Sequence, residues 1–266
     1  MSRSRSQSQS QSSQSNIITL YDIPSREPRR CWSLNPWKTR LLLNFKRLAY
    51  TTEWVEYPDV QGLIEPHLPP NERGIPYTVP TIQLQLPDGD GGGGGSEWIM
   101  GSREIATRLD VLYPTPAFSS SISADPYLAE IEAVADRIAQ TVSSDFIPKL
   151  ARRVLGAASL PYWHRTREAW FGGLTLDEVA AQKGGARVYT AVAPLVARVR
   201  ELLGRDASGP FIHGRSVSYA DFVWVGVLRF FENLGDEELA MLIGADRACH
   251  VALLEACRPW LEREDH

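Results

Sequence analysis

Hydrophobic and polar positions in the first hundred residues predict four short β-strands, one of them with the two-residue period of a half-buried strand. Residues 17–23 and 51–57 are rich in β-branched and aromatic side chains, which favour strands. Residues 79–86 alternate apolar and polar side chains, and residues 97–100 form another strand-like segment after the glycine-rich connection 87–96. This pattern predicts a hairpin with a flexible connection. In its first strand, the side chains of Ile82, Leu84 and Leu86 are predicted to face the core, and those of Thr81, Gln83 and Gln85 to face outward.

Helical periodicity appears between and after these strands. Apolar side chains recur every three to four residues over about 36–47, which predicts a helix with Asn35 as its N-cap and Pro36 at its first position. A second helix is predicted to begin with Ser102 as its N-cap. The apolar stripes are Trp37, Leu41, Phe45 and Leu48 in the first helix, and Ile105, Leu109 and Leu112 in the second. The order strand, helix, strand, loop, strand, strand, helix is thioredoxin-like and predicts an α/β domain over 16–113.

Beyond the proline-containing linker 113–118, the chain reads as helical throughout. The predicted helical segments are 125–155, 175–204 (one or two helices), 218–233 and 247–263. Ser218 and Asp221 have the spacing of a capping box, which predicts the start of a buried helix rather than a chemical site. We therefore predict an all-helical second domain over 119–266.

Composition narrows the class of protein. The 266 residues are 43% hydrophobic and 23% charged, as in ordinary globular domains, and no apolar segment approaches the roughly 20 residues that span a bilayer. The net charge of −4 argues against a nucleic-acid partner. Residues 1–15 are almost entirely serine, glutamine and arginine, which predicts a disordered tail. Three irregularly spaced cysteines fit neither a disulfide framework nor a metal site, and favour a cytoplasmic location.

Cys31, Ser33 and Asn35 lie within five positions, just before the first predicted helix. A hydroxyl and an amide at a helix N-terminus can stabilise an anion, because the terminal N–H groups carry positive potential. The same residue types are common helix caps, so the residues alone leave both interpretations open. Trp37 is predicted to pack in the core, and Lys38 is predicted to be solvated.

Two longer segments resemble the glutathione S-transferases. "SLNPWKTRLLLNFKRLAY" followed by "TTEWVEYPDV" is similar to the start of the fungal-specific class A enzymes, which are related to bacterial β-etherases. "YWHRTREAWFGGLTLDEV", residues 162–179, also resembles that class, whereas Leu34 stands where its members often have proline. The resemblance implies a thioredoxin-like α/β domain followed by an all-α domain, glutathione as co-substrate, and a homodimer. It also implies attack of the glutathione thiol on an apolar electrophile or aryl ether.

The resemblance assigns the start of the first helix to catalysis. Ser33 would hold the glutathione sulfur as a thiolate, and Asn35 would assist it. Cys31 is the rival group, because cysteine-type relatives form mixed disulfides with glutathione. In those relatives the cysteine lies six residues before a threonine, and counting back six from Thr39 reaches Ser33. Cys31 is therefore interpreted as a bystander.

The resemblance places glutathione contacts at two further points. Val79 and Pro80 would form the family's cis-proline segment, in which the backbone of the residue before proline pairs with glutathione. Ser102 would bind the γ-glutamyl carboxylate at a helix N-terminus. The acid that usually precedes this serine is replaced by Gly101, and Arg103 would add positive charge. The alternatives are that Ser102 only caps the helix and that Arg103 is an exposed side chain without a role in binding.

Aromatic side chains of the second domain are candidates for the wall of the electrophile site. They are Tyr127, Tyr162, Trp163, Trp170 and Phe171. Most aromatic residues in helices belong to the core, so none is singled out. Two alternative functions stay open: a non-catalytic carrier of small hydrophobic molecules, and a thioltransferase that depends on Cys31.

Overall fold

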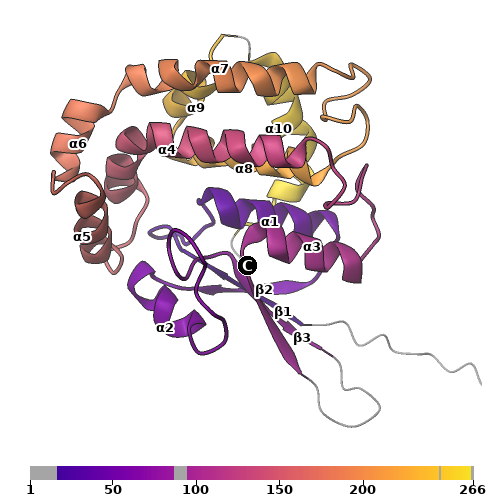
Figure 1. Cartoon of the computed structure of the whole chain (residues 1–266), viewed down its shortest axis with the longest axis horizontal. Coiled ribbons are helices and arrows are strands. Elements are labelled where there is room, and N and C mark those ends of the chain that lie inside the picture. The colour runs from indigo at the N-terminus through magenta and orange to yellow at the C-terminus, as the bar shows by residue number, and fades with distance from the viewer. Residues whose placement is uncertain (1–16, 87–94, 246, 265–266) are drawn as a thin grey trace, which may run out of the picture.

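The computed structural model describes residues 17–86, 95–245 and 247–264. The predicted tail 1–15 and most of the predicted glycine-rich connection lie outside the described residues. The described chain forms an α/β part followed by a helical part, and the two are stacked on each other (Figure 1). This is the predicted combination of a thioredoxin-like domain with an all-α domain.

The α/β part is built on a mixed four-stranded sheet with the strand order β2-β1-β3-β4. Its strands are β1 (Ile18–Asp22), β2 (Tyr50–Trp54), β3 (Thr81–Gln85) and β4 (Ser96–Met100). β1 and β2 are parallel, whereas β3 pairs antiparallel with both β1 and β4. All four predicted strands are therefore confirmed, and so is the hairpin pairing of the last two.

The predicted facing of β3 is right at its centre and wrong at its start. Ile82 and Leu84 are fully buried, as predicted, but so is Thr81, which was expected to face outward. Thr81 lies opposite Met100, and its hydroxyl donates a hydrogen bond to the carbonyl of Thr78 at 2.8 Å. This bond satisfies the buried hydroxyl, so the position tolerates a polar side chain.

The two helices of the α/β part are α1 (Leu34–Phe45) and α3 (Ser102–Leu112), and both begin differently from the prediction. The N–H of Trp37 donates to the carbonyl of Ser33, so Ser33 is the N-cap of α1 and Asn35 lies inside the first turn. Gly101 is the N-cap of α3, and Ser102 is its first residue. Gly101 has φ 99°, a conformation that glycine adopts without steric cost.

The connection from β2 to β3 contains a short 3-10 turn (Tyr57–Asp59) and α2 (Val60–Ile64). The helical part follows the linker 113–118. Its helices are α4 (Leu128–Arg153), α5 (Leu160–Trp170), α6 (Leu176–Lys183), α7 (Ala186–Leu203), α8 (Tyr219–Leu234), α9 (Asp236–Ile243) and α10 (Ala248–Leu261). Residues 175–204 thus form two helices, α6 and α7. The helices α5 and α9 lie outside the segments whose bounds were predicted from the sequence.

α8 is the central helix of the molecule. It packs against α1, α4, α9 and α10, and nearly all of its side chains are buried. The predicted capping box is present at its start: the Asp221 carboxylate accepts from the Ser218 N–H at 2.8 Å and from its hydroxyl at 2.7 Å. Ser218 Oγ in turn accepts from the Asp221 N–H at 3.3 Å.

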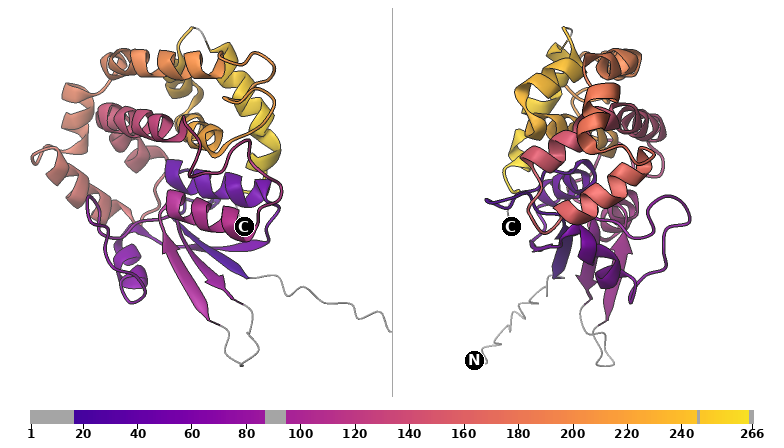
Figure 2. Two further views of the ribbon diagram at one scale, coloured as in Figure 1. Left: turned by 45° about the vertical axis from the view of Figure 1, so that its right-hand side comes forward. Right: turned by 90° about the vertical axis from the view of Figure 1, so that its left-hand side faces the viewer.

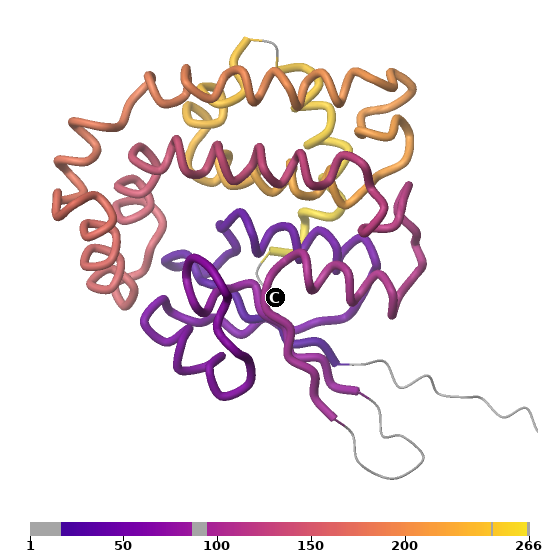
Figure 3. Tube along the Cα trace, viewed as in Figure 1, coloured from indigo at the N-terminus to yellow at the C-terminus, as the bar shows by residue number. Residues whose placement is uncertain are grey.

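The two parts share one continuous core. α1 and α3 lie between the sheet and the second domain, and α1 packs on α8 and α10 (Figures 1 and 2). The chain leaves α3 and rises along one side of the molecule to enter α4, as the tube in Figure 3 shows. Of the helices that the structure describes, none combines the length and the apolar character needed to cross a bilayer.

Candidate functional site

The first turn of α1 places Ser33 and Asn35 at the boundary between the two domains. Ser33 is half-buried and Asn35 is exposed. The Ser33 side chain does not cap α1, and its hydroxyl has no hydrogen-bond partner among the described residues. An uncommitted hydroxyl at a helix N-terminus is available to donate to an anion, and the helix adds positive potential there.

Two adjoining cavities meet at this point. Ser33, Asn35 and Tyr57 line both of them. The first cavity has a volume of about 210 Å³. Its other walls are Ile23, Val60, Ile75, Tyr77, Thr78 and Val79 from the α/β domain, and Tyr162 and Arg167 from α5. We call it the polar cavity.

The second cavity has a volume of about 150 Å³ and lies against the helical domain. Its other walls are Trp32, Leu34, Ala135, Ile138, Ala139, Phe146, Leu150, Trp163, Val227, Phe230 and Phe231. We call it the apolar cavity. Of the aromatic candidates, Tyr162 lines the polar cavity and Trp163 the apolar one. Trp170, Phe171 and Tyr127 are not among the residues that line either cavity.

Val79 brings a backbone edge to the polar cavity. The peptide bond between Val79 and Pro80 is cis, as the resemblance implies. In the described part of the chain, no hydrogen bond uses the N–H or the carbonyl of Val79. Both groups are therefore available to a ligand strand that lies beside this segment.

The start of α3 lies next to Pro80, because the Gly101 N–H donates to the Pro80 carbonyl at 3.0 Å. Ser102 opens the helix with free N–H groups in its first turn, and its carbonyl accepts from the buried Tyr219 hydroxyl at 2.8 Å. Arg103 forms an ion pair with Glu132 of α4 at 2.6 Å. Gly101, Ser102 and Arg103 are absent from the linings of both cavities. They are joined to the site through Pro80 and through Met100, whose sulfur accepts from the N–H of the lining residue Thr78 at 3.3 Å.

The Cys31 thiol lies in the protein interior, unlike the Ser33 hydroxyl at the cavity wall. It is buried, and burial raises the pKa of its thiol well above the usual range, with the neighbouring Asp22 carboxylate acting in the same direction. Asp22 pairs with Arg40 at 3.0 Å, and both side chains are fully buried. A protonated thiol is a poor nucleophile, so the environment of Cys31 disfavours its use in thiol chemistry.

Tyr57 links the two domains at the shared edge of the cavities. Its N–H donates to the Ser159 hydroxyl at 3.0 Å, and that hydroxyl donates to Glu56 at 2.5 Å. The Tyr57 ring stacks on Tyr162 with centroids 6.0 Å apart and contacts Trp163 at 5.0 Å. Burial raises the pKa of Tyr57, which keeps its hydroxyl protonated at neutral pH.

The prediction that the Lys38 side chain is solvated is wrong. The side chain is buried where α1 faces the helical domain, and burial lowers its pKa. Asp136 and Glu132 of α4 act in the opposite direction and favour the charged form. Trp37, on the same helix, is fully buried in the core as predicted.

Sequence reasoning missed several residues that the structure brings to the site. They include Trp32, Tyr57, Thr78 and Arg167. Arg167 carried a usable signal: Trp163, Arg167 and Trp170 are four and three residues apart, which places them on one face of a helix. Tyr57 is the last residue of the predicted strand 51–57 and Thr78 lies in the loop before residues 79–86, and neither position carries a sequence signal for a site.

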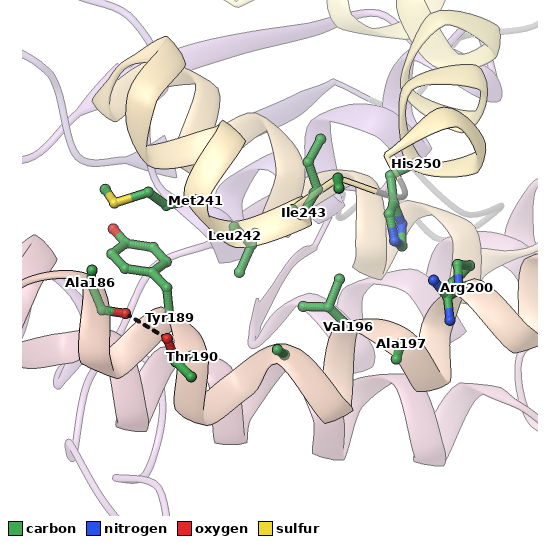
Figure 4. Close-up of a pocket in the computed structure, with 13 residues that line it drawn as sticks. Ala186, Tyr189, Thr190, Val196, Ala197, Arg200, Met241, Leu242, Ile243 and His250 are labelled. Atoms are coloured by element: carbon green, nitrogen blue, oxygen red, sulfur yellow. Dashed lines mark hydrogen bonds between the residues drawn. The ribbon is translucent and has the colours of Figure 1, made fainter.

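A larger cavity of about 500 Å³ lies elsewhere, between α7, α9 and the start of α10 (Figure 4). Its walls include Val196, Leu242 and Ile243, with Arg200 and His250 at one end. None of the predicted site residues lines it. The Trp224 indole donates to His250 Nδ1 at 3.0 Å, and burial lowers the pKa of His250 to about 4, so its imidazole is neutral at pH 7.

Comparisons with known proteins agree with this architecture. Residues 32–112 match the family described as glutathione S-transferase, N-terminal domain, and residues 129–260 match glutathione S-transferase, C-terminal domain. The chain is 30% identical over 263 residues to the glutathione S-transferase-like protein ustS of Aspergillus flavus, which covers 94% of this chain and 93% of that protein.

Solved structures show the same likeness. The fold is similar to a glutathione S-transferase of Ceriporiopsis subvermispora in complex with glutathione, with a TM-score of 0.78 and 27% identity over 94% of this chain and 100% of that one. It is also similar to glutathione transferase GSTFuA3 from Phanerochaete chrysosporium, with a TM-score of 0.71 and 26% identity over 92% of this chain and 97% of that one.

Proposed function

Because the chain belongs to the glutathione S-transferase family, we propose that it activates the thiol of glutathione for attack on an apolar electrophile or an aryl ether. The observation that carries this proposal is the position of Ser33. Its uncommitted hydroxyl borders both cavities, one beside the backbone of Val79 and one walled by the helical domain. Glutathione would extend along Val79 to the start of α3, and the electrophile would occupy the apolar cavity.

Thiolate stabilisation is the chemical task of this site. A thiol with an ordinary pKa of about 8.5 is only a few per cent ionised at neutral pH, and lowering that pKa by two units takes roughly 2.7 kcal/mol. A charge-assisted hydrogen bond contributes about 1.5–3 kcal/mol, and a helix N-terminus adds up to about 1 kcal/mol. Ser33 with the first turn of α1 would therefore suffice, with Asn35 as a second donor and no general base.

The remaining contacts follow from the family. Val79 would pair with the cysteinyl unit of glutathione through its backbone, held in place by Pro80. Ser102 would bind the γ-glutamyl carboxylate, and Gly101 gives α3 a start without the usual acid. Arg103 would contribute through its positive charge, although its guanidinium also pairs with Glu132.

Finer assignments rest on the sequence motifs. We propose that the chain is of the fungal class A, β-etherase-related type, with a glutathione-binding domain over 16–113 and a substrate-binding domain over 119–266. The likeness to GSTFuA3 supports this subtype. We also propose a cytoplasmic location and a homodimer, as is usual in the family. The buried state of Cys31 weighs against the thioltransferase alternative.

A pH profile tests the role of Ser33. Conjugation of glutathione to 1-chloro-2,4-dinitrobenzene is measured for the wild type, Ser33→Ala and Asn35→Ala. We expect Ser33→Ala to raise the apparent pKa of bound glutathione by about one to two units, because one charge-assisted hydrogen bond is lost. Asn35→Ala should give a smaller rise.

The control for this profile is Ser123→Ala, which changes an exposed serine outside both cavities and should behave as the wild type. An unchanged pKa in Ser33→Ala would remove Ser33 from the proposed role. Absence of glutathione binding in calorimetry would overturn the proposed function itself. Tight binding of hydrophobic ligands without turnover on any electrophile would favour the carrier instead.

A further inference from the structure

Arg167 is a buried cation without an acidic partner. Its side chain lies on α5 and is 5% exposed. In the described ranges no ion pair includes its guanidinium, and its titratable neighbours are the tyrosines Tyr57 and Tyr162. Its Nη1 donates a hydrogen bond to the hydroxyl of the adjacent Thr166 at 3.0 Å, and the Tyr57 hydroxyl is a second neutral partner. Its buried Nε has no partner among the described residues.

Aromatic rings hold this guanidinium in place. Its central carbon lies 3.8 Å from the ring centroid of Trp170, 4.3 Å from that of Trp163 and 5.6 Å from that of Tyr57. Cation–π contacts of this kind offset part of the cost of burial, but they leave the buried Nε without an acceptor and the cation without a counter-charge among the described residues. Burial lowers the pKa of Arg167, as expected of a cation that lacks a counter-charge.

The charge of Arg167 lies at the candidate site, beside the same cavity as Ser33. Both residues line the polar cavity, Ser33 from the first domain and Arg167 from the second. Trp163, which Arg167 contacts, lines the apolar cavity, and Tyr57 lines both. A planar molecule that lies beside these rings would therefore be flanked by the Arg167 guanidinium and by Ser33 at the start of α1.

We propose that Arg167 binds the carboxylate of an aromatic acid, so that the second substrate of this protein is an aryl carboxylate rather than a neutral electrophile. This proposal rests on the proposed function for the placement of the glutathione sulfur at Ser33. A guanidinium matches a carboxylate in planar geometry and charge, and a bound carboxylate would supply the counter-charge that Arg167 lacks. The aromatic residues around it would hold the ring.

Glutathione itself carries a glycyl carboxylate, which is the competing source of the same chemistry. The observations favour the second substrate, because Arg167 belongs to the helical domain and stacks against a wall of the apolar cavity. The experiment therefore measures glutathione and an aryl acid separately.

Calorimetry with a matched pair of unreactive probes tests the assignment. The probes are 3-nitrobenzoate and its neutral amide, 3-nitrobenzamide, titrated into the whole protein with and without S-methylglutathione. Arg167→Met keeps an apolar chain between the two tryptophans and removes the charge, and Arg167→Lys keeps the charge without the planar fork. Arg137→Met removes an exposed positive charge from α4 and serves as the control.

We expect Arg167→Met to weaken binding of 3-nitrobenzoate about 10- to 100-fold, as loss of a charge-assisted hydrogen bond predicts, and to change 3-nitrobenzamide less than about threefold. Arg167→Lys should restore part of the loss. The control should bind both probes as the wild type does. Thermal melting of each variant shows whether it is folded.

Three results would overturn the assignment. The first is equal binding of acid and amide by the wild type, and the second is equal weakening of both probes in a folded Arg167→Met protein. The third is a loss of affinity for glutathione alone, which would assign Arg167 to the glycyl carboxylate. The proposed function fails separately if glutathione does not bind, while Arg167-dependent binding of 3-nitrobenzoate would still support the carboxylate site.

Discussion

At the scale of single residues, the environment of each side chain decides which of several plausible groups is reactive. Cys31 and Ser33 are two positions apart, yet one is a buried thiol beside a carboxylate and the other a hydroxyl at a cavity wall. Arg40 and Arg167 differ in the same way: Arg40 has a buried acidic partner in Asp22, whereas Arg167 has rings and neutral hydroxyls as its partners among the described residues. Unpaired groups that face a cavity are the ones available to a ligand.

His250 provides a prediction at this scale. Its pKa is about 4 in the folded protein, chiefly because of burial and further because of Arg200, against an ordinary value of 6.5. Between these two values the unfolded chain binds a proton that the folded protein does not, so stability falls as the pH drops from 6.5 toward 4. Between pH 7 and pH 5 this amounts to about 2 kcal/mol.

The variant His250→Gln removes this titration and keeps a side-chain acceptor for the Trp224 indole. Urea unfolding at pH 7 and pH 5 measures the free energy of unfolding of both proteins. We expect the wild type to lose about 2 kcal/mol more than His250→Gln over this range. Equal losses in the two proteins would show that His250 is not kept neutral by its surroundings.

At the scale of elements, helix starts carry both stability and function. α8 begins with a reciprocal capping box, and α6 begins with another, formed by Thr175 and Glu178. α1 begins with Ser33 in the N-cap position but without a side-chain cap. An N-cap residue whose hydroxyl does not bond its own helix gives up stability, which is typical of positions retained for binding.

The capping boxes of α8 and α6 form a matched pair for a stability test. Ser218→Ala should lower the free energy of unfolding by about 1–2 kcal/mol, because Ser218 is buried and Asp221 loses its hydroxyl donor. Thr175→Ala removes the equivalent cap at an exposed site and should cost about 0.5–1 kcal/mol. Denaturant unfolding compares both with the wild type, and an equal cost would contradict the argument from burial.

At the scale of the whole molecule, the site exists because two domains are docked in one arrangement. The Ser159 hydroxyl joins Glu56 and the Tyr57 backbone to the start of α5, and Tyr219 joins α8 to Ser102. The Arg103–Glu132 ion pair links α3 to α4. The polar and apolar cavities take their walls from both domains, so their shape depends on these links.

Ser159→Ala tests this dependence. Without the hydroxyl, the Tyr57 N–H and Glu56 lose their partner on α5, and the shared wall of the cavities should loosen. We expect the KM for the electrophile to rise about 3- to 10-fold while the KM for glutathione changes little, because the α/β domain alone supplies Val79 and Ser102. Steady-state kinetics with each substrate varied in turn measures both constants; a parallel rise would indicate general destabilisation.

Local patterns of residue type and spacing in the sequence by themselves determined the four strands, the helices α1 and α3, the helical nature of the second half and the capping box of α8. These features depend on local spacing of apolar side chains and on short-range hydrogen bonds, which are written directly into neighbouring residues. The resemblance to a family directed attention to Ser33, Asn35 and Val79, which do line the same cavity.

Only the tertiary structure decided the rest. It moved the start of α1 to Leu34 and that of α3 to Ser102, and it buried Thr81 and Lys38. It also brought Tyr57 and Arg167, more than a hundred residues apart in the chain, to one cavity. Burial, pKa and the presence or absence of a counter-charge are properties of packed neighbours from distant segments, so no local pattern encodes them.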